Sequence, residues 1–173
     1  MNFGYIMHPI PKNRKLIPGI LIGVLFLNIS LIPREVSAFD IPSSKTVLDN
    51  GLTVVISEMP TSSMVSVYAL VKTGSATEGE YLGAGISHFL EHMLFKGTKR
   101  RKVGEIASRI QAVGGNINAS TASDYTIFTI TVPQERFDIA LDTLSDMLMN
   151  SVMDPVEVER ERQVIFGEMR LYH

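Results

Sequence analysis

Hydrophobic and polar residues alternate along parts of the chain, and a period of two predicts β-strands. Residues 49–51 (Asp-Asn-Gly) form a tight-turn sequence between residues 45–48 and 52–57, which predicts a hairpin. Residues 64–72 alternate again, with one apolar face made of Val65, Val67, Ala69 and Val71. Residues 125–132 are β-branched and aromatic, so they predict a further strand.

Other segments repeat hydrophobic residues every three or four positions, which predicts helices. One helix is expected from about residue 86 to 95, and a second from 103 to 113, stopped by Gly114 and Gly115. A third helix would bury the stripe Phe137, Leu141, Leu144 and Leu148. A fourth begins at Asp154 and Pro155, a cap followed by proline at the first helical position.

The expected order is therefore βββααβαα, with strands and helices segregated rather than strictly alternating. Segregation of this kind favours an α+β fold, in which a mostly antiparallel sheet packs against helices. The chain length of 173 residues suits one domain better than two.

The first 38 residues differ in pattern from the rest. A basic start at Lys12, Arg14 and Lys15 precedes an apolar, uncharged run over residues 16–33, and small residues follow at 36–38. This is the three-part pattern of a secretory signal, so we expect residues 1–38 to be a signal peptide and the protein to be exported, in a periplasm. The alternative is an uncleaved N-terminal membrane anchor, because 18 apolar residues nearly span a bilayer.

Charge and cysteine content narrow the chemistry. Residues 1–38 carry a net charge of +3 and the whole chain −2, which leaves −5 on residues 39–173 and argues against a nucleic-acid partner. The basic cluster of Lys96 with residues 99–102 is expected on a solvated loop, with steering of acidic substrates as the functional alternative. The chain has no cysteine, so any metal must be held by nitrogen and oxygen atoms.

A candidate metal site lies in the first predicted helix. His88 and His92 are four residues apart, which places both imidazoles on one helical face roughly 6 Å apart along the axis. Two imidazoles on one face suit zinc, and Glu91 on that face could take a proton from a zinc-bound water. His-x-x-Glu-His is the signature of the inverzincin peptidases. The alternative is a surface patch, which the apolar neighbours Phe89, Leu90, Met93 and Leu94 argue against, because they predict a largely buried helix.

A catalytic zinc needs a third protein ligand, and a carboxylate is expected here. The last predicted helix offers four candidates: Glu157, Glu159, Glu161 and Glu168. Glu161 and Glu168 are seven residues apart and share a face, so their spacing does not choose between them. A solvated helix face would explain Glu157 and Glu159 better than Glu168.

Several co-linear segments resemble the pitrilysin/insulinase family of inverzincin zinc metallopeptidases, which includes processing peptidases. Residues 85–98, around the two histidines, resemble the active-site segment of that family, and residues 48–52 resemble its opening hairpin. Residues 114–121 with Asp124 and Thr126, and residues 161–165 followed by Glu168, are similar to two further family segments. The resemblance covers roughly residues 44–172.

The resemblance implies a role for each matching residue. His88, His92 and Glu168 would bind one Zn²⁺, Glu91 would be the general base, and Glu161 would hold a ligand in place. Asn118 and Ala119 would lie on an edge strand to which a peptide substrate adds as an extra strand. For Asn118 the alternative is a turn residue after the two glycines.

Family members pair two related α+β domains, whereas this chain ends five residues past Glu168. We therefore expect residues 39–173 to be an incomplete first domain, an N-terminal fragment that needs a second homologous domain or subunit. The function expected from the resemblance is that of a zinc-dependent endopeptidase acting on peptides or unfolded segments. The alternatives are a non-catalytic binding or assembly subunit of a peptidase complex and an inert truncated fragment.

Overall fold

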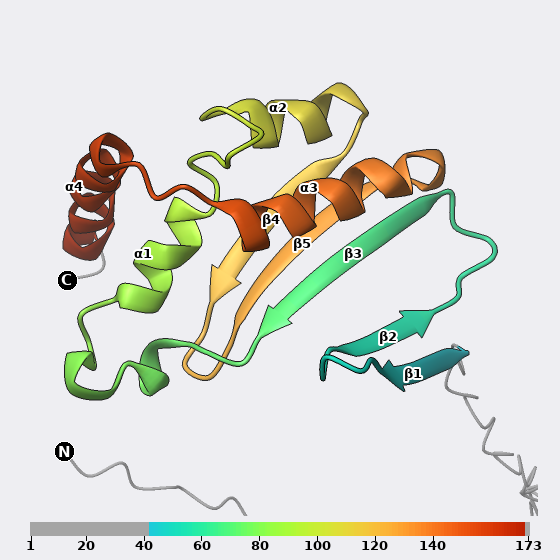
Figure 1. Cartoon of the computed structure of the whole chain (residues 1–173), viewed down its shortest axis with the longest axis horizontal. Coiled ribbons are helices and arrows are strands. Elements are labelled where there is room, and N and C mark those ends of the chain that lie inside the picture. The colour runs from blue at the N-terminus through green and yellow to red at the C-terminus, as the bar shows by residue number, and fades with distance from the viewer. Residues whose placement is uncertain (1–41, 172–173) are drawn as a thin grey trace, which may run out of the picture. The chain divides into compact units, whose positions relative to one another are not determined.

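The computed structural model describes residues 42–171 (Figure 1). The predicted signal peptide or anchor lies outside these residues. The described strands are β1 (Ser43–Val47), β2 (Thr53–Ser57), β3 (Met64–Val71), β4 (Asn116–Thr121) and β5 (Thr126–Pro133). The helices are α1 (Ile86–Met93), α2 (Glu105–Ala112), α3 (Phe137–Asn150) and α4 (Pro155–Leu171), with three short 3₁₀ turns η1 (Ser75–Thr77), η2 (Gly79–Tyr81) and η3 (Gln134–Arg136).

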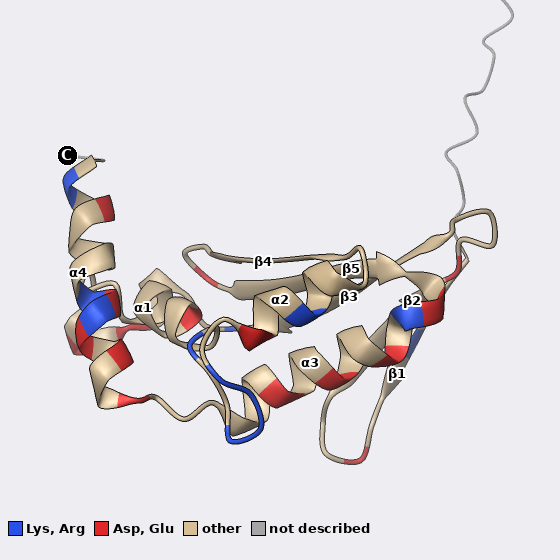
Figure 2. Ribbon diagram, turned by 90° about the horizontal axis from the view of Figure 1, so that it is seen from above, with Lys and Arg blue, Asp and Glu red and all other residues tan. Residues whose placement is uncertain are grey.

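The central sheet has three antiparallel strands in the order β3-β5-β4. Along β5, buried residues alternate with half-buried ones, and Phe128, Ile130 and Val132 face the core. Helices α2 and α3 pack against this face, as Figures 1 and 2 show. Val65, Val67 and Ala69 of β3 pack on the same core, as the alternating pattern predicts. The fold is thus α+β, with antiparallel sheets and four helices within the described residues.

Strands β1 and β2 form a separate two-stranded antiparallel sheet. The turn closes where the Asp-Asn-Gly sequence predicts, with the amide of Leu48 bonded to the carbonyl oxygen of Leu52 at 2.9 Å and Gly51 at a positive φ of 84°. Every residue of this hairpin is exposed except the half-buried Val54. The hairpin therefore has little buried surface of its own.

The predicted order βββααβαα is wrong by one strand, because β4 lies between α2 and β5. Its residues, Asn-Ile-Asn-Ala-Ser-Thr, have no strong β propensity, so the hydrophobic pattern did not identify a strand. Pairing with β5 along its whole length supplies the hydrogen bonds that propensity does not. The strand lies at an edge of the central sheet.

The predicted buried stripe of α3 is also wrong in part. Phe137 and Leu141 are exposed, whereas Ala140, Leu144 and Met147 lie in the core. The prediction holds for Leu144, which is in the core, and for Leu148, which packs against it, whereas Ala140 and Met147 lie in the core in place of Phe137 and Leu141.

The basic cluster is not a wholly solvated loop, contrary to expectation. Arg101 is only 8% exposed and pairs with Asp146 and Asp142 of α3, and the hydroxyl of Thr98 donates to Asp146 at 2.6 Å. Burial raises the pKa of Asp146, but its hydrogen bonds to Thr98, Asn150 and Arg101 outweigh that effect and hold the pKa below its ordinary value. The loop is therefore fastened to α3 by buried charge pairs, beside the acidic face seen in Figure 2.

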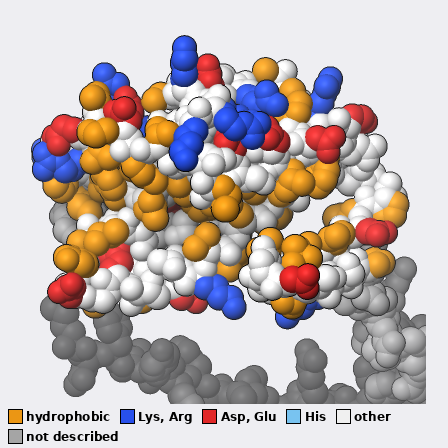
Figure 3. All heavy atoms as spheres, in the orientation of Figure 1, with side chains coloured by type: hydrophobic (Ala, Val, Ile, Leu, Met, Phe, Trp, Pro, Cys, Tyr) orange, Lys and Arg blue, Asp and Glu red, His pale blue; other side chains and the backbone are white. Residues whose placement is uncertain are grey.

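Several large hydrophobic side chains remain on the surface. Figure 3 shows hydrophobic side chains over the β1–β2 hairpin and elsewhere on this face. The exposed large hydrophobic residues include Val47, Val55, Ile56, Tyr68 and Leu70. None of the helices between residues 42 and 171 combines the length and the apolar character that crossing a membrane requires.

Candidate metal centre

The side chain of Glu78 caps the N-terminus of helix α1. Gly85 adopts a left-handed conformation with φ of 74°, and the carboxylate of Glu78 accepts hydrogen bonds from the amides of Gly85 at 3.2 Å and Ser87 at 2.8 Å. The hydrogen bond from Ser87 is the main cause of the lowered pKa of Glu78. A carboxylate from outside the helix thus satisfies amides that the helix itself leaves unpaired.

The two histidines of α1 meet one glutamate of α4. Nε2 of His88 lies 3.1 Å from Nε2 of His92, and Oε2 of Glu168 lies 3.6 Å and 3.9 Å from these two nitrogens. Ligand atoms bound to a tetrahedral zinc at about 2.0–2.1 Å would be separated by about 3.3 Å. The observed triangle is close to that size, so these three donors fit a zinc ion.

The surroundings leave this triangle open on one side. The side chains of His88 and Glu168 are each 38% exposed, and that of His92 is 21% exposed. Catalytic zinc sites leave a position for water or substrate, whereas structural sites are closed by protein ligands. The exposure of the three donors matches the open kind of site.

Glu161 contacts His92 at Nδ1, the ring nitrogen that does not belong to the triangle. Its Oε1 accepts a hydrogen bond from Nδ1 of His92 at 2.8 Å, and its Oε2 pairs with Nζ of Lys96 at 2.7 Å. Burial raises the pKa of this carboxyl, but the hydrogen bonds from Lys96 and His92 outweigh that effect, and the net shift is downward. An ionised Glu161 holds the proton of His92 on Nδ1, which leaves the Nε2 lone pair directed at the triangle.

Lys96 was predicted only as a member of the basic cluster. Its ammonium group lies between α1 and α4 and keeps Glu161 paired on both carboxylate oxygens. The spacing of the sequence could have indicated this role, because Lys96 lies four residues after His92.

Glu91 lies in the same helical turn and is only 8% exposed. Its Oε2 accepts a hydrogen bond of 2.5 Å from the hydroxyl of Thr121 in β4. A cleft of about 200 Å³ lies beside it, and its lining includes Glu91, His92, Asn118, Ala119 and Glu161. The cleft therefore joins α1, the edge strand β4 and α4.

Asn118 and Ala119 lie within β4, so the alternative of a turn position for Asn118 is wrong. Among the described residues β4 pairs only with β5, which leaves its other edge without a strand partner. Ala119 is half-buried on the side of the core, and Asn118 is exposed.

Two burial predictions for these helices need correction. The predicted burial of the apolar residues in and after α1 holds for Met93 and Leu94, but Leu90 is 46% exposed. Glu157 does not belong to a solvated face, because it is largely buried and pairs with Arg160, whereas Glu159 is exposed as expected. The approach of α4 to α1 buries Glu157, Glu161 and Ile165 along one face.

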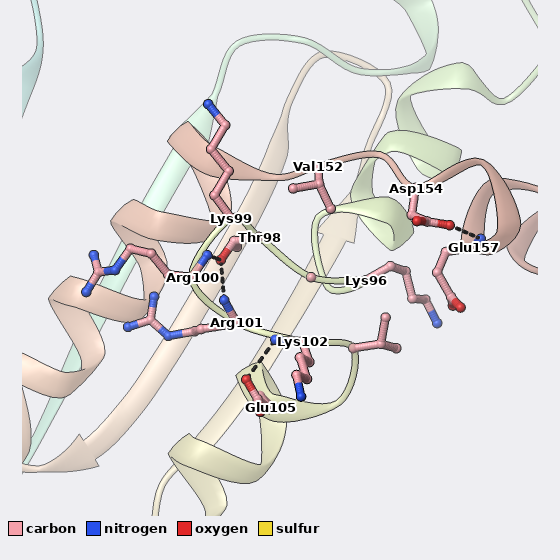
Figure 4. Close-up of a pocket in the computed structure, with 12 residues that line it drawn as sticks. Lys96, Thr98, Lys99, Arg100, Arg101, Lys102, Glu105, Val152, Asp154 and Glu157 are labelled. Atoms are coloured by element: carbon pink, nitrogen blue, oxygen red, sulfur yellow. Dashed lines mark hydrogen bonds between the residues drawn. The ribbon is translucent and has the colours of Figure 1, made fainter.

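A larger hollow of about 540 Å³ lies beside the basic loop (Figure 4). The side chains of Lys96, Lys99 and Lys102 point in different directions there, and Asp154 and Glu157 lie on its rim. Diverging cations with acidic neighbours do not form a converging site for one anion. The histidine triangle, not this hollow, is the candidate functional site.

In this α+β fold, an edge strand lies beside two histidines and a glutamate from a distant helix. This combination is typical of a class of metal-dependent peptidases. The sequence profile of the insulinase family (peptidase family M16) matches residues 53–172, and the chain belongs to this family. Several of the relatives that match this chain are named as zinc proteases.

Individual relatives agree with this assignment. The chain is 39% identical over 123 residues to an uncharacterized zinc protease, YmxG, of Bacillus subtilis, which covers 71% of this chain and 30% of the relative. It is 40% identical over 129 residues to the mitochondrial-processing peptidase subunit beta of Saccharomyces cerevisiae, covering 74% of this chain and 28% of that protein.

Solved structures give the same picture. A protease from Helicobacter pylori superposes with a TM-score of 0.71 at 33% identity, over 76% of this chain and 32% of that one. Pitrilysin superposes with a TM-score of 0.67 at 30% identity, over 77% of this chain and 14% of that one. The chain thus spans about three tenths of the length of the curated relatives it matches.

Proposed function

We propose that this chain carries the active centre of a zinc-dependent endopeptidase, with His88, His92 and Glu168 as the protein ligands of one Zn²⁺. The observation that carries the proposal is the triangle of donor atoms, with sides of 3.1, 3.6 and 3.9 Å. A zinc ion bound there would supply a Lewis acid that lowers the pKa of water and polarises a peptide carbonyl.

Glu91 is the general base in this proposal. Its carboxylate lies in the cleft beside His92 and takes the proton of the attacking water. The same carboxyl then gives that proton to the nitrogen of the leaving amine, so one residue acts first as base and then as acid. Glu161 and Lys96 hold His92 in the required orientation.

The free edge of β4 supports a peptide or an unfolded protein segment as substrate. An extended backbone can pair with Asn118 and Ala119 through main-chain hydrogen bonds, which bind a peptide with little dependence on its side chains. A folded protein does not present such a strand. The enzyme would therefore cleave flexible segments of varied sequence.

We further propose that a second homologous domain or subunit covers this cleft. One relative is named as a subunit of a processing peptidase, and the matched region is a minor part of each relative. A complete donor set with Glu91 beside it favours catalysis over the alternatives of a non-catalytic assembly subunit or an inert fragment. The signal-peptide pattern of residues 1–38 supports export to a periplasm, with an uncleaved anchor as the alternative. Apart from that anchor, neither a membrane partner nor a nucleic acid is proposed.

The test compares the full chain with the variant Glu91→Gln. Both should bind one zinc per chain by elemental analysis, but the variant should cleave fluorescein-labelled casein at least about 100-fold more slowly, because it lacks a general base. Glu159→Gln is the matched control, since Glu159 is exposed on α4 and its hydrogen-bond partners within residues 42–171 are Arg162 and Gln163. Zinc binding without cleavage by the unmodified chain would favour the assembly subunit or the inert fragment.

A further inference from the structure

A threonine at the end of the edge strand contacts the proposed base. The hydroxyl of Thr121 lies 2.5 Å from Oε2 of Glu91, although the two residues are 30 positions apart in the chain. The hydrogen bond is sheltered, because Glu91 is buried and Thr121 is half-buried. A short hydrogen bond to a charged oxygen in such a place is stronger than a neutral one in water.

The direction of this hydrogen bond follows from its partners. An ionised carboxylate only accepts, so Thr121 must donate its single hydroxyl proton to Glu91. The hydroxyl of Thr126, 3.4 Å from that of Thr121, donates to the carbonyl oxygen of Thr73 at 2.9 Å. The proton of Thr121 therefore remains committed to Glu91.

Thr121 is held by the sheet and not by α1. It faces Thr126 in the β4–β5 ladder, and the amide of Ala122 closes the turn on the carbonyl oxygen of Tyr125 at 2.8 Å. The amide of Ser75 also bonds the carbonyl oxygen of Ala122 at 3.1 Å. Gly74 permits this approach, because a Cβ there would lie only 2.2 Å from that oxygen. The backbone contacts of the sheet thus fix the position of the Thr121 hydroxyl next to α1, the helix that carries Glu91.

We propose that Thr121 is a positioning residue that fixes the carboxylate of Glu91 for proton transfer. By holding Oε2, it leaves Oε1 to receive the proton of the attacking water and to return it to the leaving amine. The inference rests on the proposed role of Glu91 as the base. Glutamate has three side-chain torsions, so without this contact its carboxylate would sample several orientations in the cleft.

The test uses two variants of the zinc-loaded full chain. Thr121→Val keeps the branched shape and removes the donor, whereas Thr121→Ser keeps the donor. For an internally quenched peptide that the unmodified chain cleaves, Thr121→Val should lower kcat about 10- to 100-fold with KM within about twofold. Thr121→Ser should recover kcat to within about threefold of the unmodified chain. Zinc content should be unchanged in both.

Thr131→Val serves as the matched control. It removes a threonine hydroxyl from the neighbouring strand β5, where that hydroxyl pairs with Ser66 at 2.8 Å, away from Glu91. Its kinetics should match those of the unmodified chain. Equal losses in Thr121→Val and Thr121→Ser, or zinc loss in Thr121→Val, would overturn the positioning role.

A second readout does not depend on turnover. Thr121→Val should lower the midpoint of thermal unfolding by about 5 °C in the unmodified background, but far less when Glu91→Ala has already removed the acceptor. Equal shifts in both backgrounds would show that the two side chains are not coupled and would overturn the inference. If Glu91→Gln cleaves as fast as the unmodified chain, the proposed function fails instead. If Glu91→Gln is inactive and Thr121→Val cleaves as fast as the unmodified chain, only the inference fails.

Discussion

We propose that Glu161, whose Oε1 accepts a hydrogen bond from Nδ1 of His92, orients that imidazole, and its removal tests this role. Glu161→Ala leaves Nδ1 of His92 without its acceptor and Lys96 without its counter-ion, so the imidazole can rotate. We expect zinc affinity to fall about 10- to 100-fold, as is usual for partners of metal-bound histidines. Titration calorimetry with Zn²⁺ measures it, with the exposed Glu159→Ala on the same helix as the control. Unchanged affinity would show that Glu161 only links α1 to α4.

At the scale of residues, the sequence predicted local geometry better than distant contacts. The spacing of His88, Glu91 and His92 places them on one helical face, and this needs only the period of a helix. On α4, the spacing did not show whether Glu161 or Glu168 is the third ligand, because both lie on one face of the helix. In the structure Glu168 approaches the Nε2 atoms and Glu161 approaches Nδ1 of His92. That difference depends on where α4 crosses α1, which no local pattern encodes.

At the scale of elements, Glu78 caps the helix that carries the proposed site. Glu78→Ala leaves the amides of Gly85 and Ser87 unpaired and should lower the free energy of unfolding by about 0.5–2 kcal/mol at pH 7. The folded-state pKa of Glu78 is lowered, so its stabilisation is complete above the unfolded value of about 4.3 and is lost as pH falls through the folded value. Urea unfolding over a pH series should therefore show a difference between variant and parent that is full at pH 7 and shrinks as the pH falls below about 4.3. Glu80→Ala, in the neighbouring exposed turn, should show none.

The features that the hydrophobic pattern missed share one cause, although the family resemblance did place Asn118 and Ala119 on an edge strand. Strand β4 has a polar sequence and exists because β5 pairs with it, and the stripe of α3 is set by the surface of the sheet beneath it. Arg101 is buried because α3 presents Asp142 and Asp146 to it. Each error concerns a residue whose environment comes from another part of the chain. Elements with strong local patterns, such as the first hairpin and α1, were predicted within a few residues.

At the scale of the whole described chain, stability is unevenly distributed. The core is formed by β5 with α2 and α3, where Ile106, Ile130 and Met147 are fully buried. The β1–β2 hairpin has five backbone pairs and almost no buried side chain. An isolated two-stranded hairpin is marginally stable in water, so this hairpin should open while the central sheet stays folded.

Hydrogen exchange tests this division. Amides of the hairpin, such as that of Val55, should exchange at least about 100-fold faster than the amide of Ile130 in β5, which opens only with the core. Mass spectrometry of peptides spanning residues 43–57 and 126–133 resolves the two regions. Val55 and Ile56 are also among the exposed hydrophobic residues, and we expect a partner domain to cover them. Adding a homologous partner domain should therefore slow exchange in the hairpin while leaving β5 unchanged. Equal protection of hairpin and β5 in the chain alone would contradict this distribution of stability.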